Sequence, residues 1–258
     1  MSDVAQPITY PPAITVEDFA RNLDAVQARI ARAAARAGRD PRSVRLLPVS
    51  KTVAEDRLRN AVAAGYHRLG ENKVQEAKRK SENLADLDVS WAVVGHLQTN
   101  KARDVAGFAA EFQALDSLRL AEALDRRLQA AGRSLDVFVQ VNTSGEESKY
   151  GLSPDEVLAF LAALPRFETL RVQGLMTLAL FSSDLERVRA CFVRLRTLRD
   201  RARDTDPDLI GPGELSMGMS GDFEVAIDEG ATCVRVGQAL FGSRAPRYDE
   251  AHYWPSGT

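Results

Sequence analysis

The stretch VRLLPVSKTVAEDRLRNAVAAGYHRLG, residues 44–70, contains the pattern that decides the fold. Its first part, residues 44–50, is a short apolar run of the kind found in strands that are covered on both faces. Residues 54–64 are typical of a helix and are followed by Gly65, a residue that often ends helices. A second strand-like run occupies residues 67–70. A strand, a helix and a strand in this order predict two parallel strands joined by a helix.

The same alternation continues to the end of the chain. Strands are predicted over residues 44–50, 67–70, 90–94, 112–115, 137–141, 170–176, 214–217 and 232–236. Helices are predicted at 16–37, 54–64, 73–84, 101–108, 118–131, 153–164, 184–203 and 223–229. This pattern predicts an α/β protein with a single (β/α)8 TIM barrel and an extra N-terminal helix. An open doubly wound sheet is the competing architecture. The first strand is not followed by G-x-G-x-x-G, which argues against a dinucleotide-binding version of that sheet.

Length and composition indicate a globular protein with one large core. The chain has 258 residues and a formal net charge of −2, which gives no general attraction for nucleic acids or anionic lipids. The barrel is predicted over 15–245, between a flexible arm at 1–14 and a tail at 246–258. The two cysteines, Cys191 and Cys233, lie in apolar runs and suggest buried thiols in a reducing compartment. With neither a membrane-span pattern nor a signal pattern in the sequence, we expect a cytoplasmic protein without membrane or nucleic-acid partners.

Lys51 is the most informative single residue. It ends the first predicted strand, and the carboxyl ends of the strands are where barrels place their active sites. Six lysines, at 51, 73, 78, 80, 101 and 149, stand against a total of 34 Lys and Arg, so the chain obtains most of its positive charge from arginine. Unlike arginine, a desolvated lysine can lose its proton and form a Schiff base with a carbonyl. The alternative is an ordinary exposed lysine at a strand end.

Two segments near the end of the barrel predict a phosphate site. Ser216, Ser220 and Gly221 precede a helix after the seventh strand, and Gly237 and Gln238 open a final short helix after the eighth. Barrels often bind phosphate at these two loops, where backbone N–H groups point at the anion. The alternative is a pair of glycine-rich turns that only cap helices. Together with a lysine across the mouth, the two segments favour a phosphorylated ligand.

Short motifs along the chain match a known family in order. They are Val49-Ser50-Lys51-Thr52, Gly70-Glu71-Asn72 with Gln75-Glu76, Gly95-x-Leu97-Gln98-x-Asn100-Lys101, Gly174-Leu175-Met176, Leu215-Ser216-Met217-Gly218-Met219-Ser220-x-Asp222, Val234-Arg235-Val236-Gly237 and Phe241-Gly242-x-Arg244. In this set the chain resembles the pyridoxal phosphate homeostasis protein family, which is related to the N-terminal barrel of alanine racemase. The resemblance covers about residues 16–244. It departs after Trp91, where Ala92-Val93-Val94 stands in place of the family's usual His-Phe-Ile before the glycine.

The resemblance implies a set of cofactor-binding residues. It implies that Lys51 holds pyridoxal 5′-phosphate (PLP) as a Schiff base, with Asn72 beside the ring and Arg235 at the pyridine nitrogen. It also implies that the phosphate is surrounded by Ser216, Ser220, Gly237 and Gln238. Arginine only donates hydrogen bonds, so it leaves the ring nitrogen unprotonated and the ring a weaker electron sink. The alternative for Arg235 is a salt bridge with Asp222 or Asp228. The sequence predicts no metal ligands.

The resemblance implies a protein that carries and buffers PLP and is not an enzyme, with apo-PLP enzymes as possible partners. Related racemases take their second base, a tyrosine, from an added domain of a partner subunit. This chain ends about a dozen residues after the predicted barrel, so we expect a monomer without that tyrosine. His67 and His96 are other candidates for a base. A low-activity PLP-dependent racemase-like enzyme and a cofactor-free Schiff-base aldolase barrel remain as alternatives.

Overall fold

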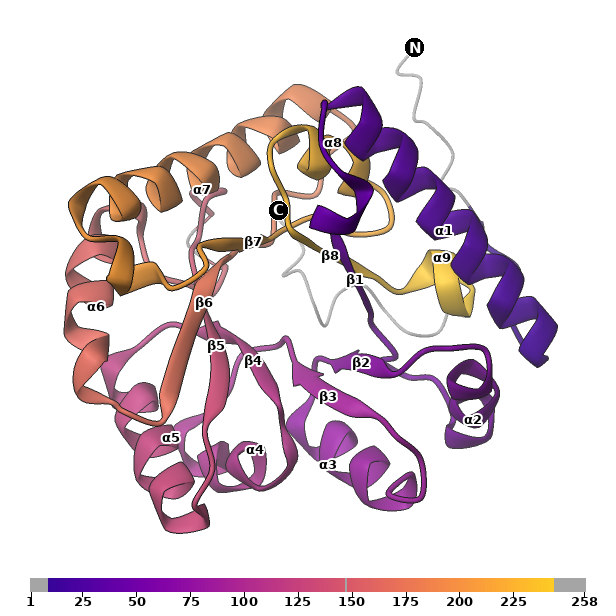
Figure 1. The fold of residues 1–258 in the computed structure, drawn as a ribbon, viewed down its shortest axis with the longest axis horizontal. Coiled ribbons are helices and arrows are strands. Elements are labelled where there is room, and N and C mark those ends of the chain that lie inside the picture. Colours follow the sequence, from indigo (N-terminus) through magenta and orange to yellow (C-terminus); the bar gives the residue numbers. More distant parts are fainter. Residues whose placement is uncertain (1–8, 147, 244–258) are drawn as a thin grey trace.

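The computed structural model describes residues 9–146 and 148–243, and it confirms the predicted barrel. Eight parallel strands form one sheet in the order β1-β8-β7-β6-β5-β4-β3-β2. The two edge strands meet through a bridge between Val49 and Gly70, so the sheet nearly closes on itself. Figure 1 shows the strands as an inner ring with the helices outside it and α1 as the additional N-terminal helix. The competing open doubly wound sheet is therefore wrong.

The elements follow the predicted alternation closely. The strands are β1 Arg45–Pro48, β2 Arg68–Glu71, β3 Ser90–Val93, β4 Glu111–Leu115, β5 Leu135–Gln140, β6 Leu170–Met176, β7 Glu214–Ser216 and β8 Cys233–Val236. The helices are α1 Val16–Arg36, α2 Glu55–Ala63, α3 Val74–Asn83, α4 Ala102–Phe108, α5 Leu118–Ala131, α6 Val157–Ala163, α7 Leu185–Thr205, α8 Phe223–Asp228 and α9 Gln238–Phe241. Each predicted helix and strand is present, with ends that differ by at most a few residues.

The extra helix α1 fastens the last elements of the barrel. It begins with a capping box, in which the N–H of Asp18 donates to Thr15 and the N–H of Thr15 donates to the Asp18 carboxylate. Arg29 then forms an ion pair with Glu224 of α8 at 2.9 Å, and the side-chain amide of Asn22 donates to the carbonyl of Leu240 at 3.0 Å. Because α9 contains Leu240, helix α1 holds the short helix that follows β8 (Figure 1).

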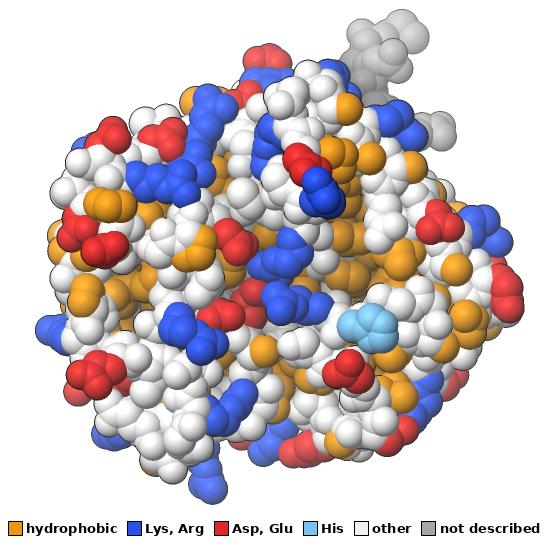
Figure 2. All heavy atoms as spheres, viewed as in Figure 1, with side chains coloured by type: hydrophobic (Ala, Val, Ile, Leu, Met, Phe, Trp, Pro, Cys, Tyr) orange, Lys and Arg blue, Asp and Glu red, His pale blue; other side chains and the backbone are white. Residues whose placement is uncertain are grey.

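The apolar core lies mainly between the sheet and the helices. Trp91 and Phe138 are among the buried core residues, and both cysteines are buried and free. The inside of the barrel is different, because a small apolar cluster of Leu47, Ala92 and Cys233 shares it with buried polar and charged side chains. Figure 2 shows acidic and basic side chains together over the centre of one face, where the strands converge.

The predicted ends of the chain fall largely outside the described residues. The part of the arm that is described pairs with the end of the barrel. The N–H of Tyr10 donates to the Ser243 hydroxyl at 2.8 Å, and the N–H of Ser243 donates to the carbonyl of Tyr10 at 2.8 Å. The domain boundaries at 15 and 245 stay predictions. In the described ranges no helix has both the length and the apolar character needed to cross a membrane.

Candidate functional site

Lys51 lies at the mouth of the barrel, just after β1. Two residues before it, the N–H of Val49 donates to the carbonyl of Val236 at the end of β8, at 2.8 Å. One residue before it, the N–H of Ser50 donates to the carbonyl of Gly70 in β2, at 2.9 Å. The half-buried Lys51 therefore follows a segment held between the ends of β2 and β8. These are the strands that lead to Asn72 on one side and Gly237 on the other.

The backbone directly after Lys51 is strained. Thr52 has φ 66°, and it is the one non-glycine residue in the described ranges with a positive φ. A β-branched side chain is costly in this left-handed region, so the surrounding structure must hold it there. The N–H of Thr52 donates to Glu76 Oε1 at 2.9 Å, which anchors the strained residue to helix α3.

A buried lysine that the sequence did not single out completes this anchor. Lys80 in α3 is fully buried, and its Nζ donates to Glu71 Oε1 at 2.6 Å, to Glu76 Oε1 at 2.7 Å and to the carbonyl of Ser50 at 2.9 Å. Burial raises the pKa of Glu71 despite these contacts. Burial acts the same way on Glu76, but there the hydrogen bond and charge of Lys80 prevail and lower the pKa. This network fixes residues 50–52 and hence the base of the Lys51 side chain.

The contacts of Lys80 with Glu71, Glu76 and Ser50, called the Lys80 network below, lead to a prediction about stability. Lys80→Met should lower the free energy of unfolding by about 3–5 kcal/mol, because it leaves two partly or fully buried carboxyl groups without their cation. Lys78→Met is the matched control, since Lys78 lies on the same helix and pairs with Asp104 at the surface. Its effect should stay within about 1 kcal/mol. Urea unfolding of both variants measures this, and equal losses would contradict the anchoring role.

Arg235 lies across the barrel interior and has no ion-pair partner among the described residues. It is 4 % exposed. Its Nη1 donates to Ser216 Oγ and its Nη2 to the carbonyl of Thr177, both at 2.7 Å. The predicted alternative, a salt bridge from Arg235 to Asp222 or Asp228, is wrong. Asp228 pairs with Arg36 instead, and Asp222 makes no ion pair with Arg235. Burial lowers the pKa of the Arg235 guanidinium, against the opposing influence of the neighbouring Cys233, Asp222 and Glu111. A buried cation of this kind is suited to face an acceptor on a ligand.

Three of the predicted phosphate residues lie together after β7 and β8. The hydroxyl of Ser220 accepts from the N–H of Gly237 at 3.3 Å and from the N–H of Ala239 at 3.4 Å, and Gln238 is exposed beside them. Before them, Gly218 has φ 95°, and a Cβ there would lie 2.7 Å from Ala226 Cβ, so only glycine fits this turn. Ser216 is placed differently, because its buried hydroxyl donates to Gln113 Oε1 at 2.7 Å inside the barrel.

Asn72 lies in a cleft at the mouth and carries an unsatisfied buried acceptor. The cleft has a volume of about 390 Å³ and is also lined by His96, Lys101 and Tyr150. The Oδ1 atom of Asn72 is buried without a hydrogen-bond partner in the described structure. A Cβ on Gly95 would lie 2.1 Å from the carbonyl oxygen of Asn72, so the cleft wall requires glycine there. Orphaned buried acceptors are rare, and this one is available to a donor that enters the cleft.

The two histidines considered as bases lie in different places. His96 stacks on Tyr150 with ring centroids 3.9 Å apart, and its Nδ1 lies 3.4 Å from Asp116 Oδ2. Burial raises the pKa of Asp116, and the neighbouring imidazole opposes that shift. His67 lies before β2, at the opposite end of the barrel, with Nδ1 3.3 Å from the carbonyl of Asp88. Only His96 is therefore near the cleft. The described residues contain no group of side chains that could hold a metal ion.

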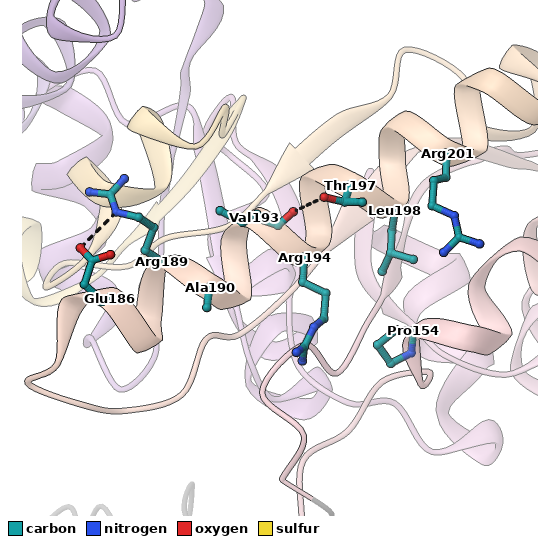
Figure 3. A pocket seen from close by; sticks show the side chains of 9 residues that line it. All are labelled: Pro154, Glu186, Arg189, Ala190, Val193, Arg194, Thr197, Leu198 and Arg201. Carbon is teal, nitrogen blue, oxygen red and sulfur yellow. Dashed lines mark hydrogen bonds and ion pairs between the residues drawn. The ribbon is translucent and has the colours of Figure 1, made fainter.

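A larger groove lies on the outside of the molecule, along α7. It has a volume of about 550 Å³, and Figure 3 shows its side chains spread along this helix with Pro154 opposite. Arg189, Arg194 and Arg201 of α7 line it, while Val188, Phe192 and Leu195 of the same helix are buried. Two of the helix's arginines, Arg189 and Arg196, bind Glu229 and tie α7 to the region after α8. None of the residues predicted for the cofactor site lines this groove.

Fold and site together define a (β/α)8 barrel with a lysine at its mouth and a buried arginine beside it. The sequence profile of the alanine racemase N-terminal domain matches residues 21–245. The chain is 44% identical over 226 residues to the pyridoxal phosphate homeostasis protein of Pseudomonas aeruginosa, covering 88% of this chain and 96% of the relative. It is 38% identical over 239 residues to the protein of the same name from Escherichia coli K12, covering 89% and 98%. The chain belongs to this family of pyridoxal phosphate homeostasis proteins, within the alanine racemase N-terminal domain group.

Solved structures agree with this assignment. PipY of Synechococcus elongatus PCC7942 with PLP bound superposes with a TM-score of 0.76 at 36% identity, covering 87% of this chain and 100% of PipY. An unknown protein from Bifidobacterium adolescentis has a TM-score of 0.82 at 34% identity, covering 90% and 99%. Alanine racemase of Clostridium difficile 630 has a TM-score of 0.69 at 17% identity, and shares the fold.

Proposed function

We propose that this protein carries and buffers PLP, which it holds as a Schiff base on Lys51. The observation that carries the proposal is that three of the predicted residues stand at the same end of one parallel barrel. Lys51, the orphaned Oδ1 of Asn72 and the buried Arg235, which makes no ion pair within the described residues, come from the ends of three different strands. The names of the relatives and the PLP-bound structure of PipY support the same ligand.

The residues at the mouth fit the cofactor group by group. Lys51 would supply the amine that condenses with the aldehyde of the cofactor, with loss of water. The remaining N–H groups of Arg235 would hold the ring nitrogen, and Asn72 would hold the side of the ring. When bound, the cofactor supplies an electrophilic aldehyde and an electron-withdrawing ring. The two hydrogen bonds of Arg235 inside the barrel leave part of its donor set for the ligand.

Ser220, Gly237 and Gln238 hold the phosphate in this proposal. The N–H groups of Gly237 and Ala239 already converge on one oxygen atom, the Ser220 hydroxyl, at long distances of 3.3 and 3.4 Å. A phosphate oxygen is a stronger acceptor than a hydroxyl and gives shorter, charge-assisted bonds. Ser216 belongs to the same site, but its hydroxyl bonds favour a role in holding Arg235 over a direct phosphate contact.

The same geometry argues against fast turnover of amino acids. An arginine at the ring nitrogen cannot accept a hydrogen bond, so it holds that nitrogen unprotonated and weakens the ring as an electron sink. We therefore assign the protein a binding role without an established reaction. We place it in the cytoplasm as a monomer, with PLP as its ligand and apo-PLP enzymes as the recipients of that ligand.

Deuterium exchange tests the absence of turnover. Loaded protein incubated with L-alanine and other amino acids in deuterated water should exchange α-protons far more slowly than ordinary enzymes, which turn over at about 1–10³ s⁻¹. Exchange or racemisation at ordinary enzyme rates would contradict the proposed homeostasis role and favour the racemase-like alternative.

One observation gives the racemase-like alternative a specific form. Tyr150 and His96 stack on each other in the cleft that Asn72 also lines, and each carries a group that can act as a base. If the protein has residual exchange activity, Tyr150→Phe should remove it and leave PLP binding intact. The cofactor-free aldolase is separated from both PLP-dependent roles by the absorption spectrum, since that protein would show no cofactor absorption when purified.

A further inference from the structure

A chain of buried polar side chains crosses the inside of the barrel and ends at Arg235. Glu111, at the start of β4, accepts a hydrogen bond from Gln113 Nε2 at 2.6 Å. Gln113 Oε1 accepts from the Ser216 hydroxyl at 2.7 Å, and Ser216 Oγ accepts from Arg235 Nη1 at 2.7 Å. All four side chains are buried. These four residues, Glu111, Gln113, Ser216 and Arg235, are called the interior chain below.

The direction of every hydrogen bond in the interior chain is fixed by its two ends. A guanidinium group can only donate, so Ser216 Oγ must accept from Arg235. The single hydroxyl hydrogen of Ser216 is then directed at the Gln113 carbonyl oxygen. The amide nitrogen of Gln113 in turn points at Glu111, whose carboxylate can only accept. The chain therefore has one consistent polarity from the cation to the carboxylate.

The far end of the interior chain is anchored by charge. Glu111 Oε2 lies 3.0 Å from Arg45 Nη2 and 3.3 Å from Arg68 Nη1, both at the amino-terminal ends of their strands. Glu214 contributes a second carboxylate, 3.4 Å from Arg45. Within this set, Arg45 and Arg68 balance the two glutamates, and the positive charge of Arg235 remains in excess at the mouth. Because neighbouring hydrogen bonds polarise each other in a low-dielectric interior, we expect the four side chains of the interior chain to be rigid.

We propose that Glu111, Gln113 and Ser216 position Arg235, so that its remaining N–H groups face the mouth and select a ligand ring with a neutral acceptor atom. Glu111 and Gln113 do not reach the mouth themselves and act through Ser216. The identity of that ring as a pyridine rests on the proposed function, whereas the orientation of the guanidinium does not. The interior chain thus determines which ligand atom is favoured next to Arg235.

A ligand comparison tests the selection. The probes are PLP and its benzene analogue, in which C–H replaces the ring nitrogen. The native protein should prefer PLP by about tenfold or more, the contribution of one hydrogen bond to a charged donor. Ser216→Ala and Gln113→Met should reduce this preference at least several-fold, and Ser216→Thr, which keeps the hydroxyl, should restore it. Glu214→Gln is the matched control, because Glu214 contacts Arg45 but lies outside the interior chain. An unchanged preference in Ser216→Ala and Gln113→Met would overturn the proposal.

A second measurement needs no ligand and separates this proposal from the proposed function. In the ligand-free protein, the side-chain N–H signals of Arg235 should be resolved in NMR spectra and show slow rotation of the guanidinium. Ser216→Ala should average these signals, and Glu214→Gln should leave them unchanged. Failure of the native protein to bind PLP would refute the proposed function alone. Averaged Arg235 signals in the native protein, or signals that do not respond to Ser216→Ala, would refute the positioning role.

Discussion

Lys51→Ala should abolish covalent attachment of PLP while leaving weak, phosphate-anchored binding. The substitution removes the amine that forms the C=N bond but leaves Ser220, Gly237 and Arg235 in place. The Lys80 network holds the backbone of residues 50–52 through Ser50 and Thr52, so the fold of the mouth should persist. Absorption of the loaded protein before and after borohydride treatment measures the loss.

The matched control for this prediction is Lys101→Ala. Lys101 lies in the cleft that contains Asn72 and is half-buried like Lys51, so its removal changes the charge of the same mouth. We expect full covalent attachment in this variant. If Lys101→Ala lost the Schiff base and Lys51→Ala kept it, the nucleophile would be Lys101 and the assignment of Lys51 would be wrong.

Removing the phosphate from the ligand should cost more than any single polar substitution in the site. Charge-assisted hydrogen bonds contribute about 1.5–3 kcal/mol each, and the converging N–H groups of Gly237 and Ala239 provide at least two. Pyridoxal should therefore bind roughly 100-fold or more weakly than PLP. Equilibrium titration of the ligand-free protein with both vitamers measures the ratio.

The phosphate prediction has an internal control in the protein. Ser220→Ala removes the hydroxyl at which the two N–H groups converge, so it should change the affinity for PLP much more than the affinity for pyridoxal. Similar affinities of the native protein for the two vitamers would be incompatible with a phosphate cradle at these loops. The two glycine-rich turns would then serve only to cap α8 and α9.

The sequence was sufficient to predict the barrel and the positions of the residues at its mouth. Strand and helix periods are local properties, so α5 was predicted over 118–131 and observed at Leu118–Ala131. Lys51 was found because it stands at the end of a predicted strand, and such ends meet at one edge of a parallel barrel, whereas the roles of Asn72 and Arg235 came from the family resemblance. That rule needs no knowledge of side-chain contacts.

Side-chain direction and burial were harder to predict. Ser216 looked like a phosphate ligand because glycines and Ser220 follow it, yet it stands two residues after Glu214. Residues i and i+2 of a strand point to the same face, so both belong to the inside of the barrel. Lys80 was counted among the six lysines and was not assigned a role. The feature that could have indicated its ion pair is Glu76, which lies four residues earlier on the same helix face.

The interior chain was missed for a related reason. Polar residues such as Glu111 and Gln113 normally indicate a solvent-facing position, and β4 was predicted to begin only at Phe112. In this barrel the helices cover the outer face of the sheet, so Phe112 and Ala114 face an apolar layer while their polar neighbours face inward. The alternation of polar and apolar residues in β4 was visible in the sequence. Which of the two sets faces inward can be assigned only once the barrel is known to be closed.

Peptide mapping after borohydride reduction tests the central claim most directly. The native protein is loaded with PLP, reduced, digested and analysed by mass spectrometry, so that the reduced C=N bond marks the lysine that formed it. The account predicts a pyridoxyl group on Lys51. A label on Lys101 or Lys149, with Lys51 unmodified, would contradict it.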